Sequence, residues 1–178
     1  RVNGRVYELY VADDDRSYED AVLVGQRVYR RDLVTGDSLL VFQDSVVPRL
    51  ASLYARLHPD DVSLGPDDEP NDDPLWSVTS TLDLDDVAGP FVSYSLHTDV
   101  ERDDVAPWHT SRRGVLDLRT GGSATLTSVA GPARAQVERA RDRLLTATLD
   151  SVRASNDARA LAALPYYRLD AASFSLTT

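Results

Sequence analysis

Two histidines and several carboxylates lie close together in the second half of the chain, a pattern that could hold a metal ion. His97 and Asp99 come just before a polar stretch, Asp103 lies within it, and His109 follows it. Imidazole and carboxylate groups bind zinc in proteins, so the two histidines could converge on one ion with either carboxylate. Two histidines in a loop are nevertheless a weak signal. We therefore predict no metal site and no cofactor.

Trp108 lies in the same stretch, directly after Pro107. We expect the segment 99–108 to be a polar loop, and an indole exposed in a loop can anchor a protein or glycan partner. The candidate ligand-binding residues are therefore Trp108, His109, His97 and Asp99. If the chain has a binding site, we expect it in the segment 99–111.

No residue pattern in the chain indicates catalysis. Cysteine is absent, which excludes disulfides and thiolate chemistry, and lysine is absent, which excludes a phosphate-binding loop that ends in lysine. A Gly-x-Ser-x-Gly nucleophile elbow is also missing. The acidic residues are too numerous for any two to be singled out as a glycosidase pair. We predict no catalytic residue, and an enzyme is the less favoured alternative.

The charge of the chain disfavours several partners. With 29 acidic and 19 basic residues, its net charge is −10, which argues against nucleic acid and anionic membrane surfaces. No run approaches the roughly 18 apolar residues of a membrane span. Many acids gather in a Pro-rich loop that lacks the spacing of an EF-hand, so we expect a solvated surface there. The absence of Lys, Ile, Met and Cys indicates a high-GC bacterial genome, salt adaptation, or both.

One short motif occurs twice. The run Asp32-Leu33-Val34-Thr35-Gly36 returns as Asp117-Leu118-Arg119-Thr120-Gly121, each time between two apolar segments. Aspartate can accept hydrogen bonds from the backbone N–H groups that follow it, and glycine permits a positive φ. Both copies therefore predict tight turns between strands. We interpret the motif as a signature of the fold and not of catalysis.

Hydrophobic periodicity predicts several strands and two helices. The expected strands are 5–11, 21–24, 26–33, 38–42, 76–84, 91–96, 113–118, 123–129, 166–169 and 173–177. One helix is expected to begin at Asp44 or Ser45 and to end before Pro59. A longer helix is expected over Pro132–Ala154, with an apolar stripe on one face and arginines on the other.

These elements predict an α+β fold in which an antiparallel sheet carries two helices. We expect residues 1–178 to form one domain. The repeated turn leaves a second arrangement open, an internal β-β-α repeat. Its related halves would be 1–59 and 76–178, joined by the acidic loop 60–75.

The second half of the chain resembles the RsiV-type extracytoplasmic domain. The resemblance rests on Phe91–Leu96, Trp108-His109, Arg113–Gly121, Thr125–Val129, the long helix and Ser173–Thr177. The segment 106–109 stands where the family has a Gly-Gly-Ala-His element, so only His109 carries over. The resemblance implies an extracytoplasmic domain that is usually not the catalytic part of its protein. Such domains occur in peptidoglycan deacetylases, in lipoproteins and in an anti-sigma factor, where the domain binds a protein.

The expected function is an extracytoplasmic, non-enzymatic binding or envelope-sensing domain that recognises a protein or glycan partner. Two alternatives stay open. One is an accessory structural subunit of a larger, membrane-associated assembly. The other is an envelope hydrolase domain that uses His109 and nearby acids.

Overall fold

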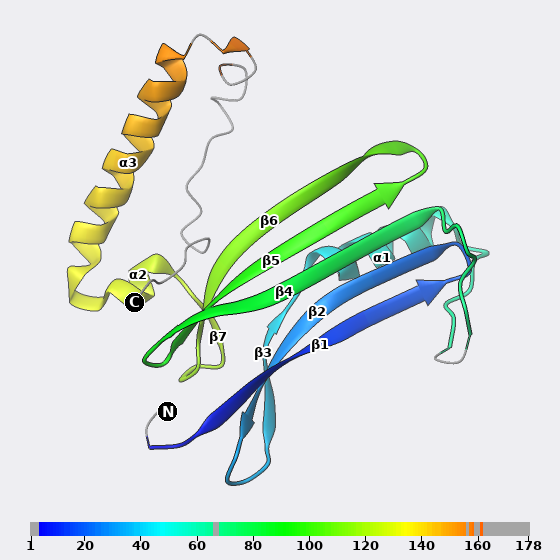
Figure 1. Cartoon of the computed structure of the whole chain (residues 1–178), viewed down its shortest axis with the longest axis horizontal. Helices are drawn as coiled ribbons and strands as arrows, with labels where there is room; N and C mark the ends of the chain where they lie inside the picture. Colours follow the sequence, from blue (N-terminus) through cyan, green and yellow to red (C-terminus); the bar gives the residue numbers. More distant parts are fainter. Residues whose placement is uncertain (1–3, 66–67, 156, 159–160, 162–178) are drawn as a thin grey trace.

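The chain folds as a curled sheet, a half-barrel with helices at its side (Figure 1). The computed structural model describes residues 4–65, 68–155, 157–158 and 161. The strands are β1 (Tyr7–Tyr18), β2 (Ala21–Asp32), β3 (Ser38–Gln43), β4 (Trp76–Ala88), β5 (Phe91–Arg102), β6 (Val105–Asp117) and β7 (Gly122–Ala124). The helices are α1 (Val46–Leu57), α2 (Leu126–Ala130), the 3₁₀ turn η1 (Gly131–Ala133) and α3 (Arg134–Ala154). The predicted α+β class is confirmed.

The sheet is mixed, so the prediction of an antiparallel sheet was only partly right. The strand order is β1-β2-β4-β5-β6-β7, with β3 as a second partner of β2. Residues 21–24 of β2 pair in parallel with residues 76–79 of β4, whereas residues 27–31 pair antiparallel with β3. The parallel pair arises because α1 and the acidic loop return the chain to the start of β2 before β4 begins.

Helix α1 covers one end of the sheet. Its side chains Val47, Ala51 and Tyr54 are fully buried against Leu23 and Trp76, among others. Burial of each large apolar side chain contributes about 1.5–3 kcal/mol, so this contact holds α1 in place. Helix α3 has no buried residue among those described and extends away from the sheet (Figure 1). None of the helices in the described part of the chain is long and apolar enough to cross a membrane.

The β1–β2 hairpin buries opposite faces at its two ends. Leu23 packs under α1, whereas Val28 packs with Leu82 and Tyr94 between two parts of the curled sheet. Residues 23 and 28 are an odd number of positions apart, so their side chains point to opposite faces of the strand. The two strands predicted over 21–24 and 26–33 are one continuous strand, β2, so the predicted break between them was wrong. Gly25 lies inside a continuous strand, where a Cβ would lie 3.2 Å from that of Val47.

Two further strand predictions differ from the structure. The first strand does not end at the acidic run Asp13–Asp15 but continues to Tyr18. The strand expected over residues 123–129 is also wrong, because β7 stops at Ala124 and a helix follows. Thr125 caps that helix reciprocally with Ser128, and this local pairing favours the helix over further strand. The strands expected at 166–169 and 173–177 lie outside the described residues.

The close packing of β5 on β6 gives a direct test of this fold. Gly114 of β6 lies opposite Tyr94 of β5, and an added Cβ would overlap the fully buried Tyr94 ring. We predict that Gly114→Ala lowers the free energy of unfolding in urea by about 1–3 kcal/mol. Gly122→Ala is the matched control, because nothing lies within 4 Å of its added Cβ. Equal stability of the two variants would contradict this packing.

Candidate functional site

The candidate segment 99–111 is a β-hairpin and not the predicted polar loop. Strand β5 continues to Arg102, and β6 begins at Val105, so only Asp103 and Asp104 connect the two strands. Asp104 forms an ion pair of 2.6 Å with Arg102, whose guanidinium lies 3.9 Å from the centre of the Trp76 ring. The acids that favoured a loop in the sequence therefore occupy the tight turn.

Pro107 is compatible with a strand because β6 is an edge strand in this region. The Leu118 N–H donates to the Pro90 carbonyl, so the backbone groups of Leu118 point toward the chain of β5. In an antiparallel pair, successive residues point their backbone groups alternately toward the partner strand and away from it. The N–H and C=O groups of residues 108, 110 and 112 therefore also point toward β5. The backbone of residues 107, 109, 111 and 113 then points outward. Proline has no N–H to donate, so an outward position at an edge is where a strand tolerates it.

Within the described part of the chain, the outer edge of β6 is unpaired along most of its length. Strand β7 pairs only with Val115–Asp117, and no other described strand pairs with the outer side of β6. All residues from Val105 to Arg113 are exposed. The outward N–H and C=O groups of His109, Ser111 and Arg113 are thus available to another strand.

The hairpin brings three of the four candidate residues to one face. Asp99 and His109 are directly opposite each other, with their Oδ1 and Nδ1 atoms 2.5 Å apart. Their side chains are 59% and 70% exposed. His97 lies on the same face, opposite Ser111. Trp108 is opposite the buried Val100 and therefore points to the other face, where it is 39% exposed.

A metal centre is not assembled from these residues. Within the described parts of the chain, no group of three or more His, Cys, Asp or Glu side chains could hold a metal ion. The Asp99–His109 pair can instead exchange hydrogen bonds with a ligand at the edge of β6. What the face offers chemically is polar recognition.

Sequence reasoning missed two arginines beside the candidate residues. Arg112 and Arg113 are exposed neighbours on β6, one on each face of the strand. Neither guanidinium forms an ion pair or hydrogen bond with the described residues. Two consecutive arginines in a strand place one positive charge on each face. This signal was present in the sequence but was hidden by the expectation of a loop.

A buried carboxylate holds the base of the hairpin. Asp44, 3% exposed, accepts hydrogen bonds from the Ser80 hydroxyl at 2.7 Å and from the Val46 N–H at 2.8 Å. The Ser80 hydroxyl also contacts the Thr98 hydroxyl of β5 at 2.9 Å. Asp44 thereby links the first turn of α1 to β4 and β5. The helix begins where it was predicted, with Ser45 at the N-cap position, but the Ser45 side chain forms no capping hydrogen bond, and Asp44, one residue earlier, accepts the first helical N–H instead.

Some of the acidic side chains are buried and hydrogen-bonded within the fold. Asp14 is 7% exposed and accepts hydrogen bonds from the side chains of Arg27 and Gln43. Burial, reinforced by Asp13 and Asp14, raises the pKa of the neighbouring Asp15.

Another structural acid comes from the predicted acidic loop. Asp61 accepts the Tyr54 hydroxyl and the N–H groups of Glu19 and Asp20. Burial tends to raise the pKa of Asp61, but these hydrogen bonds outweigh it and lower that pKa. Burial and the hydrogen bond to Asp61 raise the pKa of Tyr54.

The two copies of the repeated turn have matching hydrogen bonds. Asp32 accepts the Val34 N–H at 2.8 Å, and Asp117 accepts the Arg119 N–H at 2.9 Å. In each turn the glycine, Gly36 or Gly121, has a positive φ and donates its N–H to the carbonyl of the aspartate. The predicted turn chemistry is confirmed, and both aspartates are occupied with the fold.

Hydrogen bonds within the turns lower the pKa of both aspartates. The Val34 N–H lowers the pKa of Asp32 most, with burial opposing and Thr35 and Arg5 assisting. For Asp117, the Arg119 side chain is the main cause of the lowered pKa, and burial again opposes it.

No family model, curated protein or solved structure matches the chain. The RsiV-type resemblance therefore stays a prediction, and the residues of the site are what bears on function.

The lowered pKa values of Asp32 and Asp117 predict how stability depends on pH. A carboxylate whose pKa is lower in the folded state stabilises the fold above its unfolded pKa of about 3.9 and loses this contribution as the pH falls through the folded value. We expect the free energy of unfolding to fall below about pH 4, and the double variant Asp32→Asn, Asp117→Asn to flatten this fall. Urea titrations from neutral to acidic pH measure the effect.

The control for this experiment is Asp83→Asn, because Asp83 is an exposed carboxylate of β4 outside both turns. It should leave the pH dependence unchanged. If the double variant and the control have the same pH profile, the two turns do not contribute in this way.

Proposed function

We propose that this chain is a non-enzymatic binding domain that takes up an extended protein segment as an additional strand on the outer edge of β6. The observation that carries the proposal is the edge from Val105 to Arg113, whose residues are all exposed and whose outer side pairs with no described strand. Strand addition satisfies outward N–H and C=O groups with the backbone of the partner, while side chains on both faces supply specificity.

The opposite edge of the sheet is a poorer acceptor. The outer edge of β1 is partly occupied, because the Leu64 N–H donates to the Ser17 carbonyl and Ser63 bridges to Tyr18. It also carries the acidic run Asp13–Asp15. Native proteins use charges on an edge to prevent pairing with other strands. The β6 edge carries Pro107 and the two arginines, but no described segment occupies it as residues 63 and 64 occupy the edge of β1, which favours β6 as the binding edge.

The side chains along β6 define the chemistry of the partner. Trp108 and Arg112 lie on one face and Arg113 on the other. A complementary segment carries an apolar residue against Trp108 and acidic residues against the two arginines. The net charge of −10 repels an acidic segment at a distance, but charges are screened over about 8 Å at physiological salt. At contact, the arginines therefore dominate.

The extracytoplasmic location is retained as a proposal that rests on the RsiV-type resemblance. The internal β-β-α repeat is retained in the same way. What supports it is the pair of matching turns, each of which follows a long hairpin and precedes a short strand and a helix.

Removal of one outward donor tests the proposal. Ser111→Pro deletes an outward N–H and leaves the β5 ladder intact, whereas Ser111→Ala keeps that N–H. The probe is a short peptide with one Phe and two Glu residues spaced as Trp108, Arg112 and Arg113 are, synthesised in both chain directions. We expect saturable binding that Ser111→Pro weakens by about tenfold or more, since a lost partner leaves polar groups unsatisfied, and that Ser111→Ala preserves. Calorimetry measures the affinity.

Two results would contradict strand addition. One is equal affinity of both Ser111 variants. The other is binding of peptidoglycan fragments, but not of the peptide, by the unmodified chain, which would favour the glycan alternative. A peptide with Lys in place of Glu is the charge control and should bind more weakly.

A further inference from the structure

A polar pocket of about 80 Å³ lies between the start of α1 and β6, on the face of the sheet that carries α1. Its floor belongs to a row of hydroxyl side chains that crosses β4, β5 and β6. Thr98 of β5 is opposite Ser80 of β4 on one side and opposite Thr110 of β6 on the other. Ser80 and Thr98 are buried, whereas Thr110 is exposed, so the row leads from the interior of the fold to solvent.

Asp44 brings a negative charge to the inner end of this pocket. One of its carboxylate oxygens accepts the Ser80 hydroxyl, and the other accepts the Val46 N–H. A carboxylate has about four positions at which it accepts hydrogen bonds, so each oxygen can accept one more. No arginine or histidine of the described residues forms an ion pair with Asp44. Asp44 is therefore a buried carboxylate whose charge no cation in the described part of the chain neutralises.

Arg112 brings a positive charge to the outer end of the pocket. It follows Thr110 by two positions on β6, so both side chains project from the same face of the strand. Its guanidinium forms no ion pair with the described residues. Asp44 is bonded to β4, whereas Arg112 projects from β6, two strand spacings or about 10 Å away. The two charges therefore belong to one pocket without an ion pair between them.

This arrangement of charges selects the ligand. Asp44 and Arg112 are the charged side chains among the described residues that line the pocket. A simple cation is repelled by the guanidinium, and a simple anion is repelled by the carboxylate. A molecule with one positive and one negative group interacts favourably with both. Such a ligand has no net charge, so the charge of −10 on the chain does not repel it.

The other side chains of the pocket determine the rest of the ligand. Because the Ser80 hydroxyl is donated to Asp44, the Thr98 hydroxyl is donated to Ser80. The Thr98 oxygen can therefore accept a hydrogen bond from a ligand cation. Val46 and Leu96 add apolar surface, and the volume of about 80 Å³ leaves room for a short apolar group.

We infer that this pocket binds a free α-amino acid with a small apolar side chain. The ammonium group donates to the Asp44 carboxylate and to the Thr98 hydroxyl, and the side chain lies against Leu96. The ligand carboxylate accepts paired hydrogen bonds from the planar guanidinium of Arg112.

The dimensions of the ligand agree with this placement. The two charged groups of an α-amino acid are roughly 3 Å apart. A hydrogen bond of about 2.8 Å at each end brings the total span to roughly 9 Å. This span lies within the distance of about 10 Å between β4 and β6, so one small molecule can contact both Asp44 and Arg112.

The amino-acid site goes beyond the binding of an extended protein segment. Arg112 belongs to both the pocket and the β6 edge, but a free amino acid requires no protein partner. The two proposals can therefore fail separately.

Three ligands that differ in their charged groups test the inference. Alanine carries both groups, propionate lacks the ammonium, and ethylammonium lacks the carboxylate. We expect at least one enantiomer of alanine to bind with one-to-one stoichiometry and a Kd on the order of 0.1–1 mM, as fits a ligand of this size. Propionate and ethylammonium should each bind at least about tenfold more weakly. Titrations followed by NMR measure the affinities, and the methyl resonances of Val46 and Leu96 should shift with occupancy.

Two neighbouring arginines provide a matched pair of variants. Arg112→Gln removes the guanidinium from the pocket and should weaken alanine binding by at least about tenfold. Arg113→Gln makes the same change on the other face of β6 and should leave alanine binding unaltered. Both side chains are exposed, so both variants should fold.

Several results would overturn the inference. Two concern the ligand: neither enantiomer of alanine binds saturably, or propionate or ethylammonium binds as tightly as alanine. Two concern the location: the two arginine variants bind alanine equally well, or the methyl groups that shift lie outside the pocket.

Discussion

The arrangement of the whole sheet depends on the buried carboxylate of Asp44. Its backbone N–H donates to the Gln26 carbonyl at 2.8 Å, next to the point where β2 changes its partner from β4 to β3. Its side chain binds α1 and reaches β4 and β5 through Ser80. A buried carboxylate is costly unless it is fully hydrogen-bonded, so these partners must stay together. One residue thus fixes where β3 ends, where α1 begins and how the two parts of the sheet meet.

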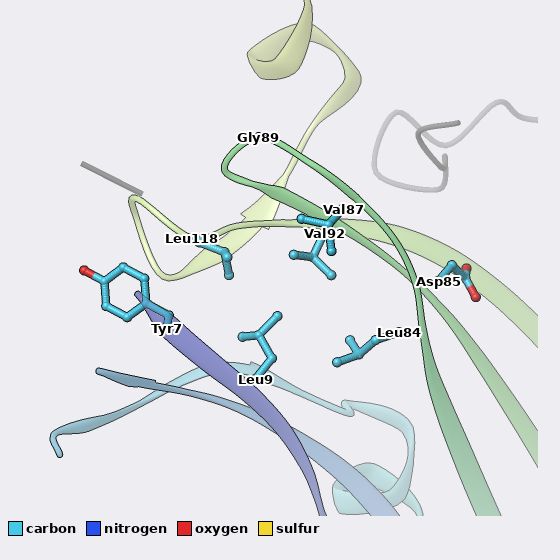
Figure 2. A pocket seen from close by; sticks show the side chains of 8 residues that line it. All are labelled: Tyr7, Leu9, Leu84, Asp85, Val87, Gly89, Val92 and Leu118. Carbon is cyan, nitrogen blue, oxygen red and sulfur yellow. The ribbon is translucent and has the colours of Figure 1, made fainter. Parts of the chain in front are cut away.

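The split of the sheet at this point also shapes the far end of the half-barrel. Beyond Gly25, β1 and β2 separate from β4, and the space between them is filled by the second apolar core. That core does not fill the far end, where an open pocket remains between Tyr7, Leu9 and Leu84 (Figure 2). On the other side, β7 is too short to cover β6, so its edge stays open. Binding surfaces are left where strands of unequal length end.

Local chemistry was predictable from the sequence, and long-range pairing was not. The two Asp–Gly turns, α1 and most strand segments follow from residues close together in the chain. The parallel pairing of β2 with β4 does not, because it depends on the path of α1 and the acidic loop. Segment 99–108 was misinterpreted because acids and a proline usually indicate a loop. In the structure, Asp103 and Asp104 form only a two-residue turn, and Pro107 lies at an unpaired edge, where a strand tolerates it. That Asp99 lies beside His109 was one of the alternatives left open by the sequence, whereas Arg112 and Arg113 were not singled out.

The proposed function depends on the open edge of β6, and amide hydrogen exchange of the free protein tests this edge most directly. An open edge predicts alternating protection along β6. The amides of Trp108, Thr110 and Arg112, which point to β5, should exchange slowly, whereas those of His109, Ser111 and Arg113 should exchange as unprotected amides do. Equal, strong protection of both sets would show that another strand already covers the edge, and it would contradict the account.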